Sequence, residues 1–233
     1  MRGFTHVDTW VFDLDNTLYP ASCRLFDQID VKMGNFVSRL LGVDYAEAKR
    51  RQKDMFYKYG TTLRGLMTEH GIAPDDFLDY VHDIDHSPVP PNQALDAALH
   101  ALPGRKLVFT NGTVAHAEKV LARIGITHHF GDIFDIVHSD FIPKPEMEPY
   151  RKFVAQTGIT PGSAAMFEDI ARNLEAPHAL GMTTVLVVSP QNKDAEHLNA
   201  ASGGLAQQHI HHITDDLAGF LGGIVANKGK AET

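Results

Sequence analysis

The amino-acid sequence predicts an α/β protein whose core is a doubly wound, parallel β-sheet, with an all-helical subdomain inserted into it. Short runs of β-forming, apolar residues recur along the chain, and segments with helical periodicity separate most of them. One connection between two such runs is far longer than a crossover between parallel strands requires. The β-forming runs lie at residues 8–14, 106–110, 133–137, 164–168 and 183–188. Runs that are apolar on both faces are typical of central parallel strands that helices cover on both sides.

The segment after the second run shows the alternation of strand and helix. Five apolar residues between Val114 and Ile124 recur at helical spacing, and Gly125 ends the pattern. Strands that alternate with helices form parallel sheets with right-handed crossovers. We therefore expect the carboxyl ends of these strands to lie along one edge of the sheet.

About ninety residues separate the first two strands, and most of this connection is expected to be helical. An apolar stripe indicates one helix between Phe26 and Leu41. Asp44 is a suitable N-cap for a second helix, with an acid three residues further on, and Gly60 ends that helix. Two shorter helices are expected to follow, before a Pro-rich linker.

These signals divide the chain into a core and an inserted helical subdomain. Residues 20–88 are expected to form the helical subdomain, and residues 1–19 and 89–226 the core. Residues 92–101 are expected to be the helix that returns the chain to the sheet. The segment 227–233 is mostly polar and is expected to be a mobile tail.

The composition and net charge of the chain exclude some classes of binding partner and leave others open. Acidic residues outnumber basic ones, 29 against 21, which argues against a nucleic-acid polymer because such binding needs a basic face. A small phosphorylated metabolite is compatible with an acidic protein, since a local site can still be positive. No apolar run approaches the roughly 18 residues of a membrane span, and we see no signal-peptide core. We therefore expect a cytoplasmic protein without a membrane partner, and the oligomeric state stays open.

Two pairs of acids are expected at the carboxyl edge of the sheet, where open α/β sheets bind their ligands. Asp13 and Asp15 end the first strand, and Glu168 and Asp169 end the fourth. Acids crowded together repel one another unless a cation lies between them or one of them holds a proton. Because hard divalent cations prefer oxygen ligands, we expect Mg²⁺ as the cofactor.

Two further features at this edge suit an anion. Thr110 and Asn111 lead into a helix N-terminus, where free backbone N–H groups can hold a phosphate, and Lys144 lies between two prolines. A carboxylate can attack phosphorus while a second acid protonates the leaving oxygen. Each motif alone also occurs as a turn, a helix cap or a surface lysine. Their common position at strand ends favours a phosphoryl-transfer site.

The order of these motifs resembles the haloacid dehalogenase (HAD) superfamily of phosphohydrolases, over nearly the whole chain. The matching residues are VFDLDNT at 11–17, FTN with Thr110, PKP with Lys144, and MFED at 166–169. The inserted segment resembles the helical cap that many members carry directly after the first motif. The resemblance implies a Rossmann-like core with a cap of residues 20–88.

The resemblance also implies roles for the acids in a Mg²⁺-dependent phosphomonoester hydrolase that forms an aspartyl-phosphate. Asp13 would be the nucleophile and Asp15 the general acid/base. The metal would be held by Asp13, by the backbone carbonyl of Asp15, and by Asp169 with Glu168, and which acid of the last pair binds it directly stays open. Asp15 argues against a true dehalogenase, whose leaving halide needs no proton.

For the substrate phosphate, the resemblance implies that Thr110, Asn111 and Lys144 hold it and that Lys144 neutralises it. The segments DNTLYP, YGTTLRGL, YVHDID and PGRKLVFTNG resemble the pyrimidine 5′-nucleotidase group, which removes phosphate from UMP- or CMP-like nucleotides. A nucleoside monophosphate is therefore the expected substrate. The cap residues expected to meet the nucleoside are Tyr19, Tyr57, Tyr59, Thr61, Thr62, Arg64 and His82. For the tyrosines, packing within the cap is the alternative.

Other functions stay open at this point. One is a phosphatase for another small metabolite, such as phosphoglycolate or a sugar phosphate, and another is a β-phosphoglucomutase-like mutase, in whose relatives the Glu-Asp pair occurs. A catalytically silent binding module on the same fold is the alternative from a different class. The His-rich segment with His209, His211 and His212 is expected to be a half-exposed strand rather than a metal site, and His128 and His129 are expected at the surface.

Overall fold

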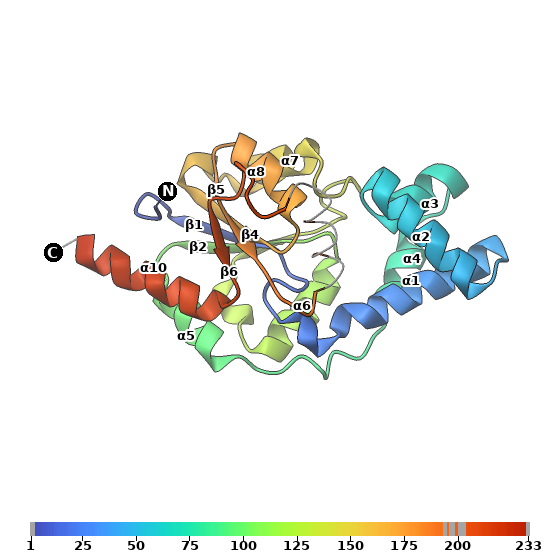
Figure 1. The fold of residues 1–233 in the computed structure, drawn as a ribbon, viewed down its shortest axis with the longest axis horizontal. Coiled ribbons are helices and arrows are strands. Elements are labelled where there is room, and N and C mark those ends of the chain that lie inside the picture. The colour runs from blue at the N-terminus through green and yellow to red at the C-terminus, as the bar shows by residue number, and fades with distance from the viewer. Residues whose placement is uncertain (1–2, 193–194, 196–198, 200–203, 232–233) are drawn as a thin grey trace.

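The computed structural model describes residues 3–192, 195, 199 and 204–231, and within them six strands form one parallel sheet (Figure 1). The strands are β1 (Thr9–Phe12), β2 (Arg105–Phe109), β3 (Asp132–Phe134), β4 (Ala164–Glu168), β5 (Thr183–Val187) and β6 (His212–Thr214). Their order is β3-β2-β1-β4-β5-β6. The chain winds outward from β1 to one edge and from β4 to the other, which confirms the predicted doubly wound, Rossmann-like α/β fold.

Helices cover both faces of the sheet, and β1 shows why both faces are apolar. Trp10 and Phe12 belong to one hydrophobic cluster and Val11, between them, to the other. The first cluster includes side chains of α5 (Gln93–Ala101), α6 (Val114–Ile124) and α10 (Leu217–Ala231), and the second those of α7 (Met147–Thr157) and α8 (Glu175–Ala179). All four residues of β1 are buried, as a central strand requires.

The connection from β1 to β2 forms a group of helices at one end of the molecule (Figure 1). After a short 3₁₀ turn, η1 (Ala21–Cys23), the helices are α1 (Leu25–Leu41), α2 (Tyr45–Tyr59), α3 (Thr62–His70) and α4 (Pro74–His82). They share a separate hydrophobic cluster that includes Val37, Leu66 and Phe77. Ile136, which follows β3, belongs to the same cluster, so these helices also pack against the sheet's carboxyl edge.

Local signals set the bounds of α2. The Asp44 carboxylate accepts a hydrogen bond from the Glu47 N–H at 2.9 Å, and Gly60, with a φ of 85°, donates its N–H to the Phe56 carbonyl at 3.0 Å. A Cβ at Gly60 would lie 3.0 Å from the Pro143 side chain. A glycine therefore lets the end of α2 lie close to the loop that carries Lys144.

Two segments differ from the prediction. The strand expected over 133–137 ends at Phe134, because the Asp135 carboxylate accepts hydrogen bonds from the N–H groups of Val137 and His138 and turns the chain. Residues 227–231, expected in a mobile tail, continue α10, and residues 232–233 lie outside the described residues.

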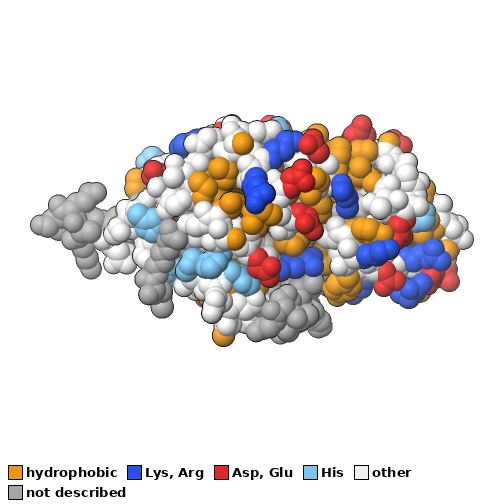
Figure 2. All heavy atoms as spheres, turned by 90° about the horizontal axis from the view of Figure 1, so that it is seen from above, with side chains coloured by type: hydrophobic (Ala, Val, Ile, Leu, Met, Phe, Trp, Pro, Cys, Tyr) orange, Lys and Arg blue, Asp and Glu red, His pale blue; other side chains and the backbone are white. Residues whose placement is uncertain are grey.

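The face of the molecule in Figure 2 carries charges of both signs, interspersed with hydrophobic side chains. On α2, Arg50 forms ion pairs with Glu47 at 2.6 Å and with Asp54 at 2.7 Å. Among the described residues, no helix combines the length and the apolar character needed to cross a membrane.

Candidate active site

The carboxyl ends of β1, β2 and β4 converge on Lys144, a lysine whose side chain is buried. Its ammonium donates to Asp13 Oδ1 at 2.6 Å, to Glu168 Oε1 at 2.7 Å and to the Phe109 carbonyl at 3.0 Å. These three acceptors lie at the ends of strands that are direct neighbours in the sheet, with β1 in the middle. The strand order thus brings together residues that are 131, 24 and 35 positions from Lys144 in sequence.

Asp169 completes an acidic cluster at this position. One carboxylate oxygen each of Asp13, Glu168 and Asp169 lies within 4.8 Å of the others, and all three residues are buried. When ionised, three carboxylates against one lysine leave two uncompensated negative charges. Because their oxygens are the ligand type that hard divalent cations prefer, the residues present fit a Mg²⁺ ion.

The two acids of the second pair are held differently. Glu168 accepts three hydrogen bonds, from Lys144 Nζ and Asn173 Nδ2 at Oε1 and from the Ile170 N–H at Oε2, each at 2.7 Å. Asp169 accepts one from Asn192 Nδ2 at 2.6 Å. The hydrogen bonds at both oxygens fix Glu168 in its place, whereas Asp169 has fewer such donors among the described residues.

The excess of acids over bases is visible in the pKa values of the cluster. Burial, with the charges of Glu168 and Asp15, raises the pKa of Asp13 to about 7 although Lys144 opposes the shift. Burial and the neighbouring acids also raise the pKa of Asp169 well above its usual range. For Lys144, burial lowers the pKa, but Asp13 and Glu168 outweigh it and raise the pKa above the usual value.

Thr110 and Asn111 form hydrogen bonds within the loops that border this cluster. Asn111 holds the backbone of Lys144: its Oδ1 accepts from the Lys144 N–H at 2.9 Å and its Nδ2 donates to the Lys144 carbonyl at 3.4 Å. Thr110 Oγ1 accepts from the Gly112 N–H at 2.9 Å, just before the N-terminus of α6. Both predicted phosphate-binding residues therefore lie beside the lysine.

Asp15 has two side-chain partners, Tyr19 and His116, that its sequence motif does not predict. Its Oδ1 accepts from the Tyr19 hydroxyl at 2.6 Å and lies 3.0 Å from His116 Nε2. Burial acts to raise the pKa of Asp15, but His116 and the Tyr19 hydroxyl outweigh it and lower the pKa. Tyr19, expected to contact the nucleoside, is buried and instead donates to this carboxylate.

His116 belongs to a group of three histidines that lies over Asp15. The His116 side chain is fully buried, its ring stacks on His82 with centroids 4.7 Å apart, and its Nδ1 lies 3.3 Å from His86 Nε2. Burial and the neighbouring His116 lower the pKa of His82 to about 4. The sequence contains His116 in the segment that follows FTNG, but its partner Asp15 is 101 positions away.

A cavity of about 280 Å³ connects the acidic cluster to the helices of the insert. Asp13, Lys144 and Asp169 line one end of it. Much of the remaining wall is apolar and includes Phe26, Ile29, Met33, Phe56, Phe77, Leu78, Val81 and Ile136. The cavity can therefore hold a small molecule whose charged group faces the cluster and whose remainder is largely apolar or planar.

The cap residues predicted to contact the substrate divide into two groups. Tyr57, Thr61, Thr62 and His82 line the cavity. Tyr59 and Arg64 are not among the described residues that line it. The Tyr59 hydroxyl instead donates to Glu69 at 2.8 Å, an interaction that ties α2 to α3.

Comparisons with known proteins agree with this arrangement. Residues 7–181 match the family model of haloacid dehalogenase-like hydrolases. Phosphate metabolism protein 8 of Saccharomyces cerevisiae is 30% identical over 193 residues, which are 75% of this chain and 60% of the yeast protein. The chain thus spans about three fifths of the length of that relative.

Solved structures share the fold. A HAD phosphatase from Thermococcus onnurineus has a TM-score of 0.59 at 16% identity and covers 92% of this chain and 96% of its own. YfnB from Bacillus subtilis, solved with bound magnesium, has a TM-score of 0.58 at 13% identity and covers 94% and 98%. At these identities the likeness concerns the fold alone.

Proposed function

The chain belongs to the haloacid dehalogenase-like hydrolases, and we propose that it is a Mg²⁺-dependent phosphomonoester hydrolase acting on nucleoside monophosphates. The observation that carries this proposal is the buried cluster in which Lys144 joins Asp13 and Glu168 at the end of the cavity. Such a cluster combines a carboxylate nucleophile, a cation for the phosphate and an acidic site for a metal.

In this proposal Asp13 and Asp15 share the chemistry. The negative charge of a bound phosphate favours the protonated form of Asp15, against the effect of His116 and Tyr19. A carboxylate oxygen of Asp13 attacks phosphorus, the ester P–O bond breaks, and the leaving oxygen takes the proton of the Asp15 carboxyl group. The Asp15 carboxylate then takes a proton from water, the water oxygen attacks phosphorus, and the bond to Asp13 breaks to release inorganic phosphate. The Tyr19 and His116 contacts at 2.6 and 3.0 Å hold Asp15 for both steps.

The phosphate would be bound between Lys144 and the start of α6. Lys144 neutralises part of its charge, and Thr110 and Asn111 supply a hydroxyl and an amide beside it. Because Asn111 makes two hydrogen bonds to the Lys144 backbone, it also sets the position of the lysine. The N-terminus of α6 adds the positive end of a helix dipole.

The metal would be held by Asp13, the Asp15 carbonyl and the second acidic pair. Within that pair we assign Asp169 as the direct ligand, because Glu168 already accepts three hydrogen bonds at its two oxygens. Bound Mg²⁺ would offset the negative charge of the cluster and of the phosphate. Support comes from YfnB, whose fold is similar and whose structure contains magnesium.

The cavity wall supports the proposed substrate class. A planar nucleobase can pack against the apolar side chains, and Gln52, Thr61 and Thr62 in the same wall can form hydrogen bonds with the ribose hydroxyls. This favours a nucleoside monophosphate, and with the motif resemblance a pyrimidine nucleotide, over a sugar phosphate. We propose that residues 20–88 act as the cap that closes over this group, with Tyr57, Thr61 and His82 in the wall.

Phosphate release from a panel of metabolites tests the proposal. The purified protein is incubated with UMP, CMP, AMP, phosphoglycolate and glucose 6-phosphate, in Mg²⁺ and in chelator. We expect release from UMP and CMP that requires Mg²⁺. Release from phosphoglycolate or the sugar phosphate alone would overturn the substrate assignment, and no release from any compound would contradict the hydrolase assignment.

A further inference from the structure

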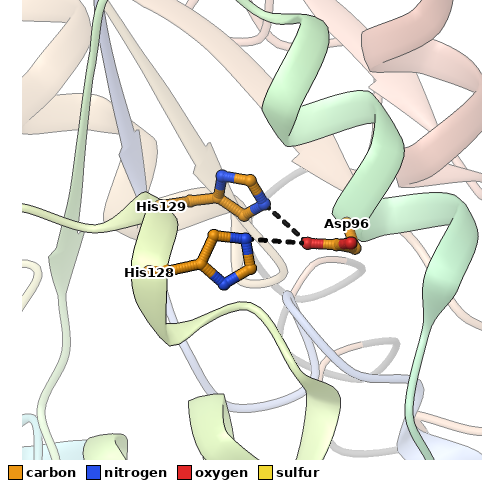
Figure 3. Close-up of side chains that lie close together, drawn as sticks. All are labelled: Asp96, His128 and His129. Carbon is orange, nitrogen blue, oxygen red and sulfur yellow. Dashed lines mark hydrogen bonds and ion pairs between the residues drawn. The ribbon is translucent and has the colours of Figure 1, made fainter.

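A group of side chains of the types that can bind a metal ion lies apart from the candidate active site. Asp96 on α5 faces His128 and His129 on the 3₁₀ turn η2 (Thr127–His129), and both imidazole rings point toward its carboxylate (Figure 3). Asp96 Oδ1 is 2.7 Å from His129 Nε2 and 3.2 Å from His128 Nε2. None of the three residues lines the cavity.

The distances within this group match those between ligands of one metal ion. A tetrahedral Zn²⁺ ion has bonds of about 2.0–2.1 Å to nitrogen and oxygen, which places its ligand atoms about 3.3 Å apart. One ligand atom from each of the three residues, a ring nitrogen or a carboxylate oxygen, lies within 4.8 Å of the others. Changes of no more than about 1.5 Å in these separations would therefore bring three ligand atoms to bonding distance of a common ion.

We propose that Asp96, His128 and His129 form a binding site for a divalent transition metal ion, Zn²⁺ being the expected one. Two imidazoles and one carboxylate are ligands that suit Zn²⁺ and exclude Mg²⁺, which prefers oxygen alone. The three protein ligands leave at least one coordination position for water or a further side chain.

The environment of the three ligands suits such a site. The His129 side chain is 6% exposed and is therefore held in place by its surroundings, whereas His128 and Asp96 are 62% and 42% exposed and give an ion access from solvent. His100 lies one helical turn after Asp96 on α5, with its ring centroid 6.3 Å from that of His129. It is the candidate for a fourth ligand.

The consequence of binding would be structural. The ion would connect α5, which returns the chain from the inserted helices, to η2, which leads into β3. A ligand that binds only the folded chain shifts the unfolding equilibrium toward the native state. Zn²⁺ should therefore raise the melting temperature of the protein.

The test measures Zn²⁺ binding to the tag-free, full chain by calorimetric titration, after metal removal and in excess Mg²⁺ to occupy the acidic cluster. We expect one Zn²⁺ ion per chain. The substitutions Asp96→Asn and His128→Ala should each weaken its affinity by at least about tenfold, and both should abolish the rise in melting temperature. Asp96→Asn conserves the shape of the side chain, so its melting temperature without Zn²⁺ checks that the fold is intact.

The matched control is His70→Ala, which removes an exposed histidine at the end of α3 and should leave Zn²⁺ binding unchanged. His128→Ala should also retain full phosphate release in Mg²⁺, because His128 takes no part in the proposed reaction. Equal Zn²⁺ affinity in the wild-type and both ligand variants would overturn the proposal. Absence of binding by the wild type in excess Mg²⁺ would overturn it too, leaving the contacts in Figure 3 as hydrogen bonds only.

Discussion

The Lys144 ammonium and the Asp13 carboxylate form a buried ion pair of 2.6 Å that joins the loop before α7 to the end of β1. Lys144 also bonds Glu168, so a single side chain ties the ends of β1 and β4 together. Asp13 and Glu168 have little access to water that could stabilise their negative charges. Among the described residues, Lys144 is therefore their main counter-charge.

Replacement of Lys144 should therefore cost stability as well as activity. Lys144→Met leaves Asp13 and Glu168 buried without their cation, and we expect a loss of about 3–5 kcal/mol in the free energy of unfolding, measured with urea in chelator. The control is Lys152→Met, which removes a half-buried lysine paired with exposed Asp140 and should change stability by less than about 1 kcal/mol. Equal losses in the two variants would show that Lys144 is not the main counter-charge.

The proposed nucleophile can be tested by a change that conserves shape. Asp13→Asn should abolish phosphate release while the protein remains folded, because an amide cannot form the covalent bond to phosphorus. Far-UV circular dichroism and the melting temperature monitor the fold. Asp8→Asn, an exposed acid just before the same strand, should keep full activity. Substantial turnover by Asp13→Asn would rule out Asp13 as the nucleophile.

Asp15 should affect the rate without being essential for the covalent step. Asp15→Asn is expected to slow turnover by about 10²–10⁴, the usual contribution of a general acid/base. Tyr19→Phe keeps the carboxylate and removes one hydrogen bond to it, so a smaller loss is expected. A decrease of less than threefold in Asp15→Asn would exclude this residue from proton transfer.

In the metal-free protein, the contribution of Asp13 to stability should decrease as the pH rises, whereas the lowered pKa of His82 acts in the opposite direction. Burial raises the pKa of Asp13 from 3.8 to about 7 in the folded state, so between these values the folded chain binds more protons than the unfolded chain. The contribution of Asp13 to the free energy of unfolding is therefore fully present below about pH 4 and is lost as the pH increases to 7. Urea unfolding of the wild type and of Asp13→Asn, in chelator at pH 5 and pH 7, isolates this contribution, which is on the order of a few kcal/mol.

Two comparisons identify the source of that pH dependence. Asp13→Asn removes the titrating group, so its stability should fall less between pH 5 and pH 7 than that of the wild type. Mg²⁺ binds the ionised carboxylates and should restore stability at pH 7. The assignment fails if wild type and Asp13→Asn show the same pH dependence in chelator.

The sequence predicts the fold and the first contacts of the site because both depend on local patterns. Apolar runs and helix caps such as Asp44 mark the elements, and parallel strands place Asp13, Thr110 and Glu168 at one edge once the winding is known. The end of α2 at Gly60 is also a local signal, because a glycine readily adopts the positive φ that this position requires.

Contacts between distant elements are the part that local patterns do not contain. Nothing near Asp15 in sequence indicates that His116 lies against it, or that Tyr19 turns to its carboxylate rather than to the cavity. Likewise His128 and His129 suggest a surface turn until the packing of α5 brings Asp96 beside them. For His116, His128 and His129 the partner is fixed by the packing of α6 and α5, which depends on the whole fold.

The position of β1 in the middle of the sheet has a consequence for refolding. Asp13 meets its partners only after β2 and β4, whose residues lie about 90 and 150 positions later in the chain, have paired on either side of it. Helical content forms from near neighbours and can return early when denaturant is diluted. Recovery of phosphate release should therefore lag behind the circular dichroism signal and report the moment at which the last of these distant strands has docked.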